Sequence, residues 1–178
     1  FTQLEIVSKD SLSLQLNALK IYQKLITFHQ NKNNKNALAE IDIQRLKFVN
    51  EHANFNEKEN SLLSTLKNSQ NYFKNEEASA LYAFEIASIY RNQSTEYLVN
   101  KVIEHRFKNK DALAICNEAI ERFPESLGAL KCKILKSQIS EKSLSIQAEE
   151  FIPINQKSRV LVTYKNVNQL QFLNPILL

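Results

Sequence analysis

The sequence predicts a mainly α protein, built from antiparallel helical hairpins of the tetratricopeptide-like type, with a short β hairpin at its C-terminal end. The 178 residues include one Gly and three Pro, so few residues are available to interrupt helices. Apolar residues recur at three- and four-residue spacing along most of the chain, as on amphipathic helices. After Gln147 this spacing stops, and residues 159–164 are rich in β-branched and aromatic side chains.

The first two helices are predicted from apolar stripes separated by a polar turn. Ser8 and Asp10 are the expected caps of the first helix, because their side chains can accept a hydrogen bond from an unpaired backbone N–H. Residues 31–36 are Asn and Lys, a run that favours a turn. The second helix is then expected from about Ala37 to His52. The stripe of the first helix contains Leu12, Leu16, Leu19, Tyr22, Leu25 and Ile26.

A third helix is predicted after Asn56, which with Glu59 resembles a capping box. Its apolar stripe is expected to contain Leu62, Leu63, Leu66, Tyr72 and Phe73. Together with the helices before it, this segment predicts stacked helical hairpins.

Residues 78–138 carry the most specific pattern, a match to one tetratricopeptide repeat. Small residues there allow two helices to approach closely, and a proline ends the second helix because it cannot donate the next hydrogen bond. Cys116 takes the position between the two alanines of that second helix. The residues expected to pack the repeat are Ile86, Ala87, Tyr90, Ala112, Ala119 and Pro124. A further helix is expected after Ser126, with Leu127, Leu130, Ile134, Leu135 and Ile139.

The repeat departs from the ideal pattern between its two helices. Residues 92–111 form an insertion, with a short helix expected around Tyr97 to Ile103. The aromatic side chains around it are expected to pack between helices rather than to line a ligand groove; they are Tyr82, Phe84, Tyr90 and Tyr97.

The C-terminal segment is predicted to form strands. Residues 159–164 favour one strand, Lys165 and Asn166 suit a turn, and residues 167–172 favour a second strand. The expected organisation is a helical-repeat domain at residues 1–148 and a β tail at 149–178. Because the chain begins at Phe1 and contains no Met, it is expected to be a piece of a longer protein.

The composition argues against several classes of function. The net charge of +4 arises from 23 basic and 19 acidic residues that are interleaved, a pattern of solvated helix faces rather than of nucleic-acid binding. No apolar run approaches the roughly 20 residues of a membrane span, so no membrane insertion is expected. Three histidines, His29, His52 and His105, lack the spacing of a helical metal pair. Gly128 alone cannot form a phosphate-binding loop. We therefore expect no enzyme activity, metal or cofactor.

Cys116 and Cys132 lie on consecutive predicted helices, with the Pro124 turn almost midway between them. This placement would allow the two thiols to meet. In an oxidising compartment they would form a disulfide, and in a reducing one they would be two small core residues. The sequence leaves both alternatives open.

Four phrases of the chain resemble the helical region of bacterial alpha-2-macroglobulin family proteins, just ahead of their first macroglobulin-type β-sandwich. They are residues 18–26, 42–49, 112–120 and 159–167. The resemblance implies an exported, cell-envelope location, a Cys116–Cys132 disulfide and a β tail that opens a sandwich. Members of the family are similar to protease-trapping inhibitors, some with a thioester in a Cys-x-x-Gln-type motif. No such motif occurs here.

Two hypotheses follow for the function. In the first, the chain is a non-catalytic scaffold or interaction segment of an envelope-associated macroglobulin-like protein, and its partners are other domains of that protein or another protein. In the second, it is a stand-alone tetratricopeptide adaptor that holds a partner peptide in a groove lined by Asn and Lys residues.

Overall fold

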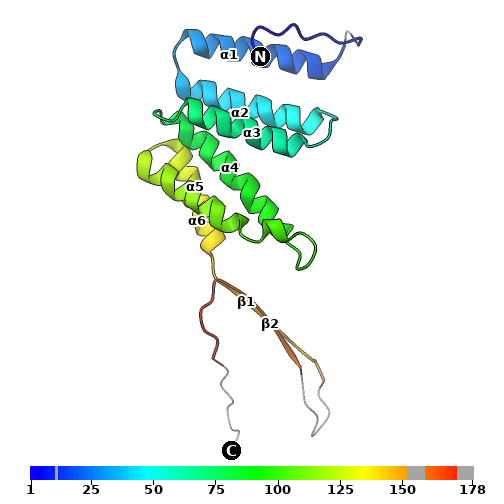
Figure 1. Ribbon diagram of the computed structural model, residues 1–178, viewed down its shortest axis with the longest axis vertical. Coiled ribbons are helices and arrows are strands. Elements are labelled where there is room, and N and C mark those ends of the chain that lie inside the picture. Colours follow the sequence, from blue (N-terminus) through cyan, green and yellow to red (C-terminus); the bar gives the residue numbers. More distant parts are fainter. Residues whose placement is uncertain (11, 152–158, 172–178) are drawn as a thin grey trace, which may run out of the picture. The chain divides into compact units, whose positions relative to one another are not determined.

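The computed structural model describes residues 1–10, 12–151 and 159–171. Within these ranges it confirms a mainly α fold, with six α-helices packed in antiparallel pairs and a C-terminal two-stranded hairpin (Figure 1). The chain divides into two compact units, Phe1–Lys136 and Ser137–Leu178. The helices are α1 (Leu14–Asn31), α2 (Lys35–His52), α3 (Lys58–Tyr72), α4 (Ala78–Thr95), α5 (Lys108–Arg122) and α6 (Leu127–Ser140).

Helix α1 begins later than the sequence predicts. Its cap is Ser13, whose Oγ accepts a hydrogen bond from the backbone N–H of Leu16 at 3.3 Å. The predicted caps, Ser8 and Asp10, are wrong. Each accepts a backbone N–H two residues further along the chain, because short polar side chains also stabilise local turns outside helices.

Helices α2 and α3 differ in how well their starts were predicted. Helix α2 begins at Lys35, close to the predicted start, after the cap residue Asn34. The predicted capping box at α3 is wrong, because the cap is Glu57, in the left-handed region at φ 57°, and it makes no side-chain bond. The Glu59 carboxylate instead accepts a hydrogen bond from Gln93 Nε2 of α4 at 2.7 Å.

Helix α4 forms the centre of the helical unit. It packs against α3, α5 and α2, and small residues dominate the buried first half of the helix. Gly128 of α6 lies against it so closely that a Cβ there would come within 2.2 Å of the Ala80 carbonyl carbon. The buried residues of α4 are Ala78, Ser79, Ala80, Leu81, Tyr82, Ala83, Glu85, Ile86, Ala87, Tyr90 and Gln93.

The residues expected to pack the repeat lie mostly in this core. Five of them are buried: Ile86, Ala87, Tyr90, Ala112 and Ala119. Pro124 is exposed and follows Phe123, the residue at which α5 ends. Helices α4 and α5 pack against each other, and all five buried residues belong to one of these two helices.

The insertion is shorter than predicted, and the helix expected around Tyr97 to Ile103 is wrong. Helix α4 continues to Thr95, residues 98 and 102 pair in an isolated β-bridge, and a 3₁₀ turn, η1, spans Ile103–His105. Asn100 lies inside the bridged turn at φ 69°. Asn tolerates this left-handed conformation, which helices do not contain.

The second unit contains a hairpin whose strand pairing differs from the prediction. Strand β2 (Val160–Lys165) pairs antiparallel with the upstream strand β1 (Ser143–Ala148), in a register that runs from Ser143 opposite Lys165 to Ala148 opposite Val160. The predicted partner strand is wrong over residues 167–171, which form no strand, and Phe172 lies outside the described residues. Strand β1 also lies ahead of the expected domain boundary at residue 149.

Asn166 explains why no strand follows β2 directly. Its φ is 55°, and its side-chain amide donates hydrogen bonds to the carbonyl oxygens of Ile139 at 2.8 Å and Glu141 at 3.0 Å. These bonds hold the residue after β2 against the last turn of α6 and the residue that follows it. Within the described residues, the chain therefore leaves the hairpin at Asn166, and residues 167–171 do not pair with β2.

Candidate functional site

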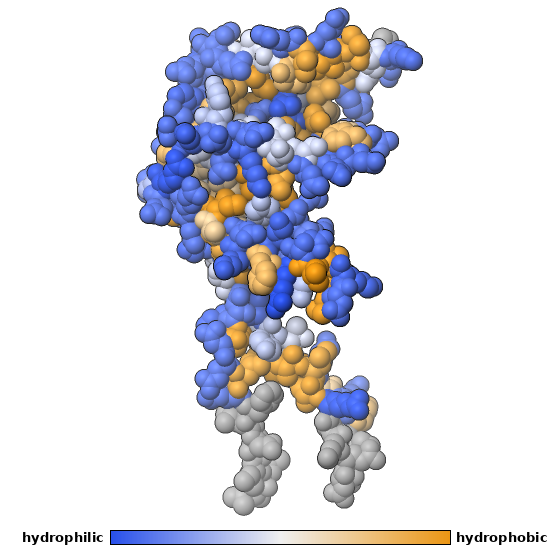
Figure 2. Space-filling model, in the orientation of Figure 1, coloured by the Kyte–Doolittle hydropathy of each residue, from blue (hydrophilic) through white to orange (hydrophobic). Residues whose placement is uncertain are grey.

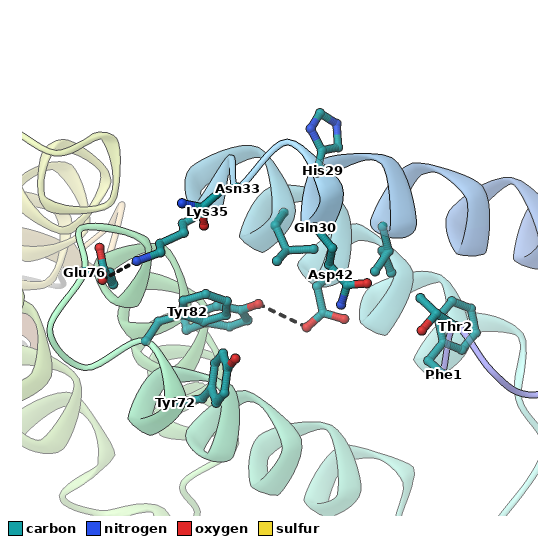
Figure 3. Close-up of a pocket in the computed structure, with 13 residues that line it drawn as sticks. Phe1, Thr2, His29, Gln30, Asn33, Lys35, Asp42, Tyr72, Glu76 and Tyr82 are labelled. Atoms are coloured by element: carbon teal, nitrogen blue, oxygen red, sulfur yellow. Dashed lines mark hydrogen bonds and ion pairs between the residues drawn. The ribbon is translucent and has the colours of Figure 1, made fainter.

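A cleft of about 590 Å³ lies between the α1/α2 hairpin and the α3/α4 hairpin. We call it the interhairpin cleft (Figure 3). Helices α1 and α2 contribute its aliphatic and amide side chains, and α4 with the end of α3 contributes aromatic rings. The cleft is lined by Phe1, Thr2, Ile26, His29, Gln30, Asn33, Lys35, Leu38, Asp42, Tyr72, Phe73, Glu76 and Tyr82.

Asp42 of α2 is the central polar group of the cleft. Its Oδ1 pairs with Arg45 Nη2 at 2.6 Å, one turn along the helix, and its Oδ2 accepts a hydrogen bond from the Tyr82 hydroxyl at 3.1 Å. Burial raises the pKa of Tyr82 well above its ordinary value of 10.0, and the neighbouring Asp42 charge raises it further. The phenol therefore remains a hydrogen-bond donor that joins α4 to α2.

A second pair of oppositely charged side chains also lines the cleft. Lys35 Nζ at the start of α2 lies 2.5 Å from Glu76 Oε1, in the loop that precedes α4. Each acidic side chain of the lining thus has a basic partner, Arg45 for Asp42 and Lys35 for Glu76. The cleft offers a ligand no unpaired charge among these four groups.

One wall of the cleft is aromatic. The rings of Phe73 and Tyr82 stack with centroids 5.8 Å apart, and Tyr72 meets Phe73 edge to face at 4.9 Å. The sequence predicts Tyr72 on the apolar stripe of its helix, but the side chain, at the last residue of α3, is 82% exposed. Its ring is available at the cleft's edge.

The first residues of the chain line one end of the cleft. The Arg45 guanidinium lies 4.5 Å from the centre of the Phe1 ring. Gln23 Nε2 of α1 donates to the carbonyl oxygens of Phe1 at 3.0 Å and Leu4 at 2.7 Å. Arg45 of α2 thus contacts the aromatic ring of Phe1, and Gln23 of α1 binds the backbone of the same segment.

The cysteines flagged in the sequence come together, and both are free thiols in the structure. Cys116 and Cys132 are fully buried. Hydrogen bonding with the Cys132 thiol lowers the pKa of Cys116, while the same contact raises the pKa of Cys132 and burial raises it further. The two thiols are therefore neighbours, and the disulfide between them stays a prediction.

The histidines lie at helix ends, as the sequence predicts. His29 is in the last turn of α1, His52 ends α2 and His105 ends the 3₁₀ turn. The His29 ring points away from the interhairpin cleft (Figure 3). Over the residues that the structure describes, no cluster of three or more His, Cys, Asp or Glu side chains could hold a metal ion.

Large apolar side chains also reach the surface in patches (Figure 2). We call the outward stripe of α6 formed by Leu127, Leu130 and Ile134 the α6 face. These residues follow one another at three- and four-residue spacing and are 49%, 47% and 60% exposed. A second stripe on α1 contains Leu14, Ile21, Leu25 and Phe28, and the hairpin exposes Leu144, Ile146, Val160, Leu161 and Tyr164.

Sequence reasoning missed the interhairpin cleft. Its polar contacts join residues about 40 positions apart, such as Tyr82 with Asp42 and Lys35 with Glu76. The only local signal is the spacing of Asp42 and Arg45, which suits an ion pair within a helix. That spacing does not reveal that Asp42 also binds Tyr82 on the α3/α4 hairpin.

Comparisons of the chain with models of known protein families, with curated proteins and with solved structures find no match. In the described part of the chain, none of the helices combines the length and the apolar character needed to cross a bilayer.

Proposed function

We propose that this chain is a non-catalytic helical scaffold, an interaction segment that packs against other protein through exposed apolar faces. The observation that carries the proposal is the α6 face. Leu127, Leu130 and Ile134 form a helical stripe of the kind that packs against another helix. Burial of such side chains is worth about 1.5–3 kcal/mol each, so covering the stripe would stabilise a complex.

The hairpin supports the same proposal. Nearly every residue of β1 and β2 is exposed on both faces of the hairpin, and an isolated two-stranded hairpin is marginally stable in water. Further strands beside it would bury these side chains. This agrees with the macroglobulin resemblance, in which residues 159–167 resemble the opening of a β-sandwich in an envelope-associated, endopeptidase-inhibitor-like protein.

Site-specific photo-crosslinking in the protein's native source tests the scaffold proposal. A photo-reactive residue in place of Ile134 should give a discrete crosslink to protein, either another part of the same chain or a partner. The matched control is Glu121, an exposed polar position on α5, which should give none. Equal yields at both positions would exclude a specific contact at the α6 face.

The macroglobulin assignment has its own test. Sequencing the gene downstream of the codon for Leu178 should reveal repeated β-sandwich domains of about 100 residues each. A gene without such domains would overturn this assignment while leaving the scaffold proposal in place.

A second candidate function is a tetratricopeptide-type adaptor that binds a partner peptide. The observation that favours it is the interhairpin cleft, which combines an aromatic wall with the amides of Gln30 and Asn33. Clefts of this size with a few polar groups are typical ligand sites. A pull-down that recovers one peptide-bearing partner, and loses it when cleft residues are substituted, would favour the adaptor over the scaffold.

A further inference from the structure

We propose that the interhairpin cleft binds an extended peptide segment through a neutral aromatic side chain. This rests on the adaptor function proposed above and names the class of ligand that it would take. The charge pairs of the cleft, its aromatic wall and the N-terminal residues that line one end of it lead to the same class.

The charge pairs argue against an ionic ligand. Asp42 is held by Arg45 and Tyr82, and Glu76 is held by Lys35. A cationic ligand would have to displace one of these partners, and an anionic ligand would meet two carboxylates. Because a charge that leaves water without a partner is unfavourable, a neutral ligand fits this lining better.

The aromatic wall specifies the side chain. The Tyr72 ring is exposed at the edge of the cleft and packs edge to face with Phe73, which itself stacks on Tyr82. Ile26 and Leu38 supply aliphatic contacts. An entering aromatic ring could continue this series of edge-to-face and stacked contacts, which stabilise aromatic pairs beyond the area they bury.

The chain's own N-terminal residues show how an aromatic residue is held beside the cleft. Phe1 places its ring against Arg45 while Gln23 holds the carbonyl oxygens of Phe1 and Leu4. Gln30 lies two turns further along α1 and also lines the cleft. In this proposal its amide holds a carbonyl oxygen of the peptide, as the Gln23 amide holds those of Phe1 and Leu4.

The test uses the 178-residue chain, which contains no Trp. The fluorescence of a Trp-containing probe can therefore be followed without background. The probe is the neutral peptide acetyl-Gly-Gln-Trp-Gln-Gly-amide. We expect saturable binding below about 1 mM, with the blue shift of a ring that leaves water. Peptides with Lys or Glu in place of Trp should not displace the probe.

Two variants locate the binding. Tyr72→Ala should weaken binding of the probe about fivefold, the scale of one aromatic pair, with little loss of stability because the ring is exposed. Phe151→Ala removes an aromatic ring that is equally exposed, at 82%, but lies outside the cleft, and it should leave the affinity unchanged. A denaturation curve for each variant shows whether it is folded.

Two results would overturn this inference, and they differ in what they mean for the adaptor. If the Lys or Glu peptide binds in a Tyr72-dependent manner and the Trp peptide does not, the cleft is a peptide site but the ligand class is wrong. If no peptide binds, or if Tyr72→Ala has no effect on binding, the adaptor function fails at this cleft as well. The scaffold proposal depends on the α6 face and is untouched by either result.

Discussion

Tyr82 shows how one residue serves both the core and the cleft. Its ring is buried and stacks on Phe73, while its hydroxyl reaches Asp42 on another helical hairpin. The sequence predicts its packing role, because the residue lies on a helix rich in small and apolar residues. The hydrogen bond could not be predicted, since it depends on how α2 and α4 are arranged in space.

Tyr82→Phe should lower the free energy of unfolding by about 1 kcal/mol at neutral pH, the typical value of one hydrogen bond. The pKa of Tyr82 is raised in the folded protein, so above the ordinary value of 10.0 the unfolded chain loses this proton while the folded protein keeps it. The contribution of Tyr82 to the free energy of unfolding is therefore fully present below pH 10 and decreases as the pH rises further. Urea unfolding between pH 7 and 11 measures the effect.

The control for this prediction is Tyr72→Phe, which removes a hydroxyl from an exposed ring. Wild type and Tyr72→Phe should lose stability equally as the pH rises, whereas Tyr82→Phe should lose less. Parallel pH profiles for all three proteins would show that ionisation of the Tyr82 hydroxyl does not change the free energy of unfolding.

Gly128 provides a second prediction at the residue scale. A Cβ at this position would collide with the backbone of α4 at Ala80, so Gly128→Ala should destabilise the protein by about 1–3 kcal/mol despite the better helix propensity of Ala. Ser137→Ala, at an exposed position on the same helix, is the control and should be neutral or slightly stabilising. Thermal unfolding distinguishes the two; a stabilised Gly128→Ala would contradict the close contact.

At the scale of the element, helix boundaries depend on which of several similar side chains acts as the cap. Ser8, Asp10 and Ser13 could each begin α1, and only the structure identifies Ser13. We expect Ser13→Ala to lower stability by about 1 kcal/mol. Ser8→Ala, which removes only an exposed turn contact, should cost much less. Chemical denaturation compares them, and equal losses would argue against Ser13 as the cap.

The thiol pair makes a prediction about helices α5 and α6. Because Cys116 and Cys132 are fully buried, an alkylating reagent should modify either residue only as fast as these helices open, far more slowly than an exposed thiol. A cysteine placed at Ser137 in the Cys116→Ala, Cys132→Ala background gives the exposed reference rate. Labelling of the native thiols at this reference rate would contradict the packing of the two helices.

Of the two strands, only β2 could be predicted from the local sequence pattern. Residues 159–164 were recognised because they are continuous and rich in β-branched residues, and β2 lies there. Strand β1 alternates polar and apolar residues over only six positions, too few to separate it from the end of a helix. Its pairing with β2 connects segments separated by more than ten residues, which local spacing does not predict.

At the scale of the whole molecule, the helical architecture was predictable and its surfaces were not. The small residues at Ala87, Ala112 and Ala119 indicate close helix packing from the sequence alone, and all three are buried. The α6 face has the same apolar spacing as any buried helix stripe. Only the arrangement of the helices shows that Leu130 and Ile134 remain uncovered.

Hydroxyl-radical footprinting of the α6 face tests the scaffold proposal most directly. Leu130 and Ile134 should be oxidised readily in the purified 178-residue chain, where both side chains are exposed. In the protein within its native source they should be protected several-fold, while the exposed hydrophobic reference Phe107, 62% exposed, keeps its rate. Equal oxidation of Leu130 and Ile134 in the two samples would contradict the claim that this helical unit is a scaffold for other protein.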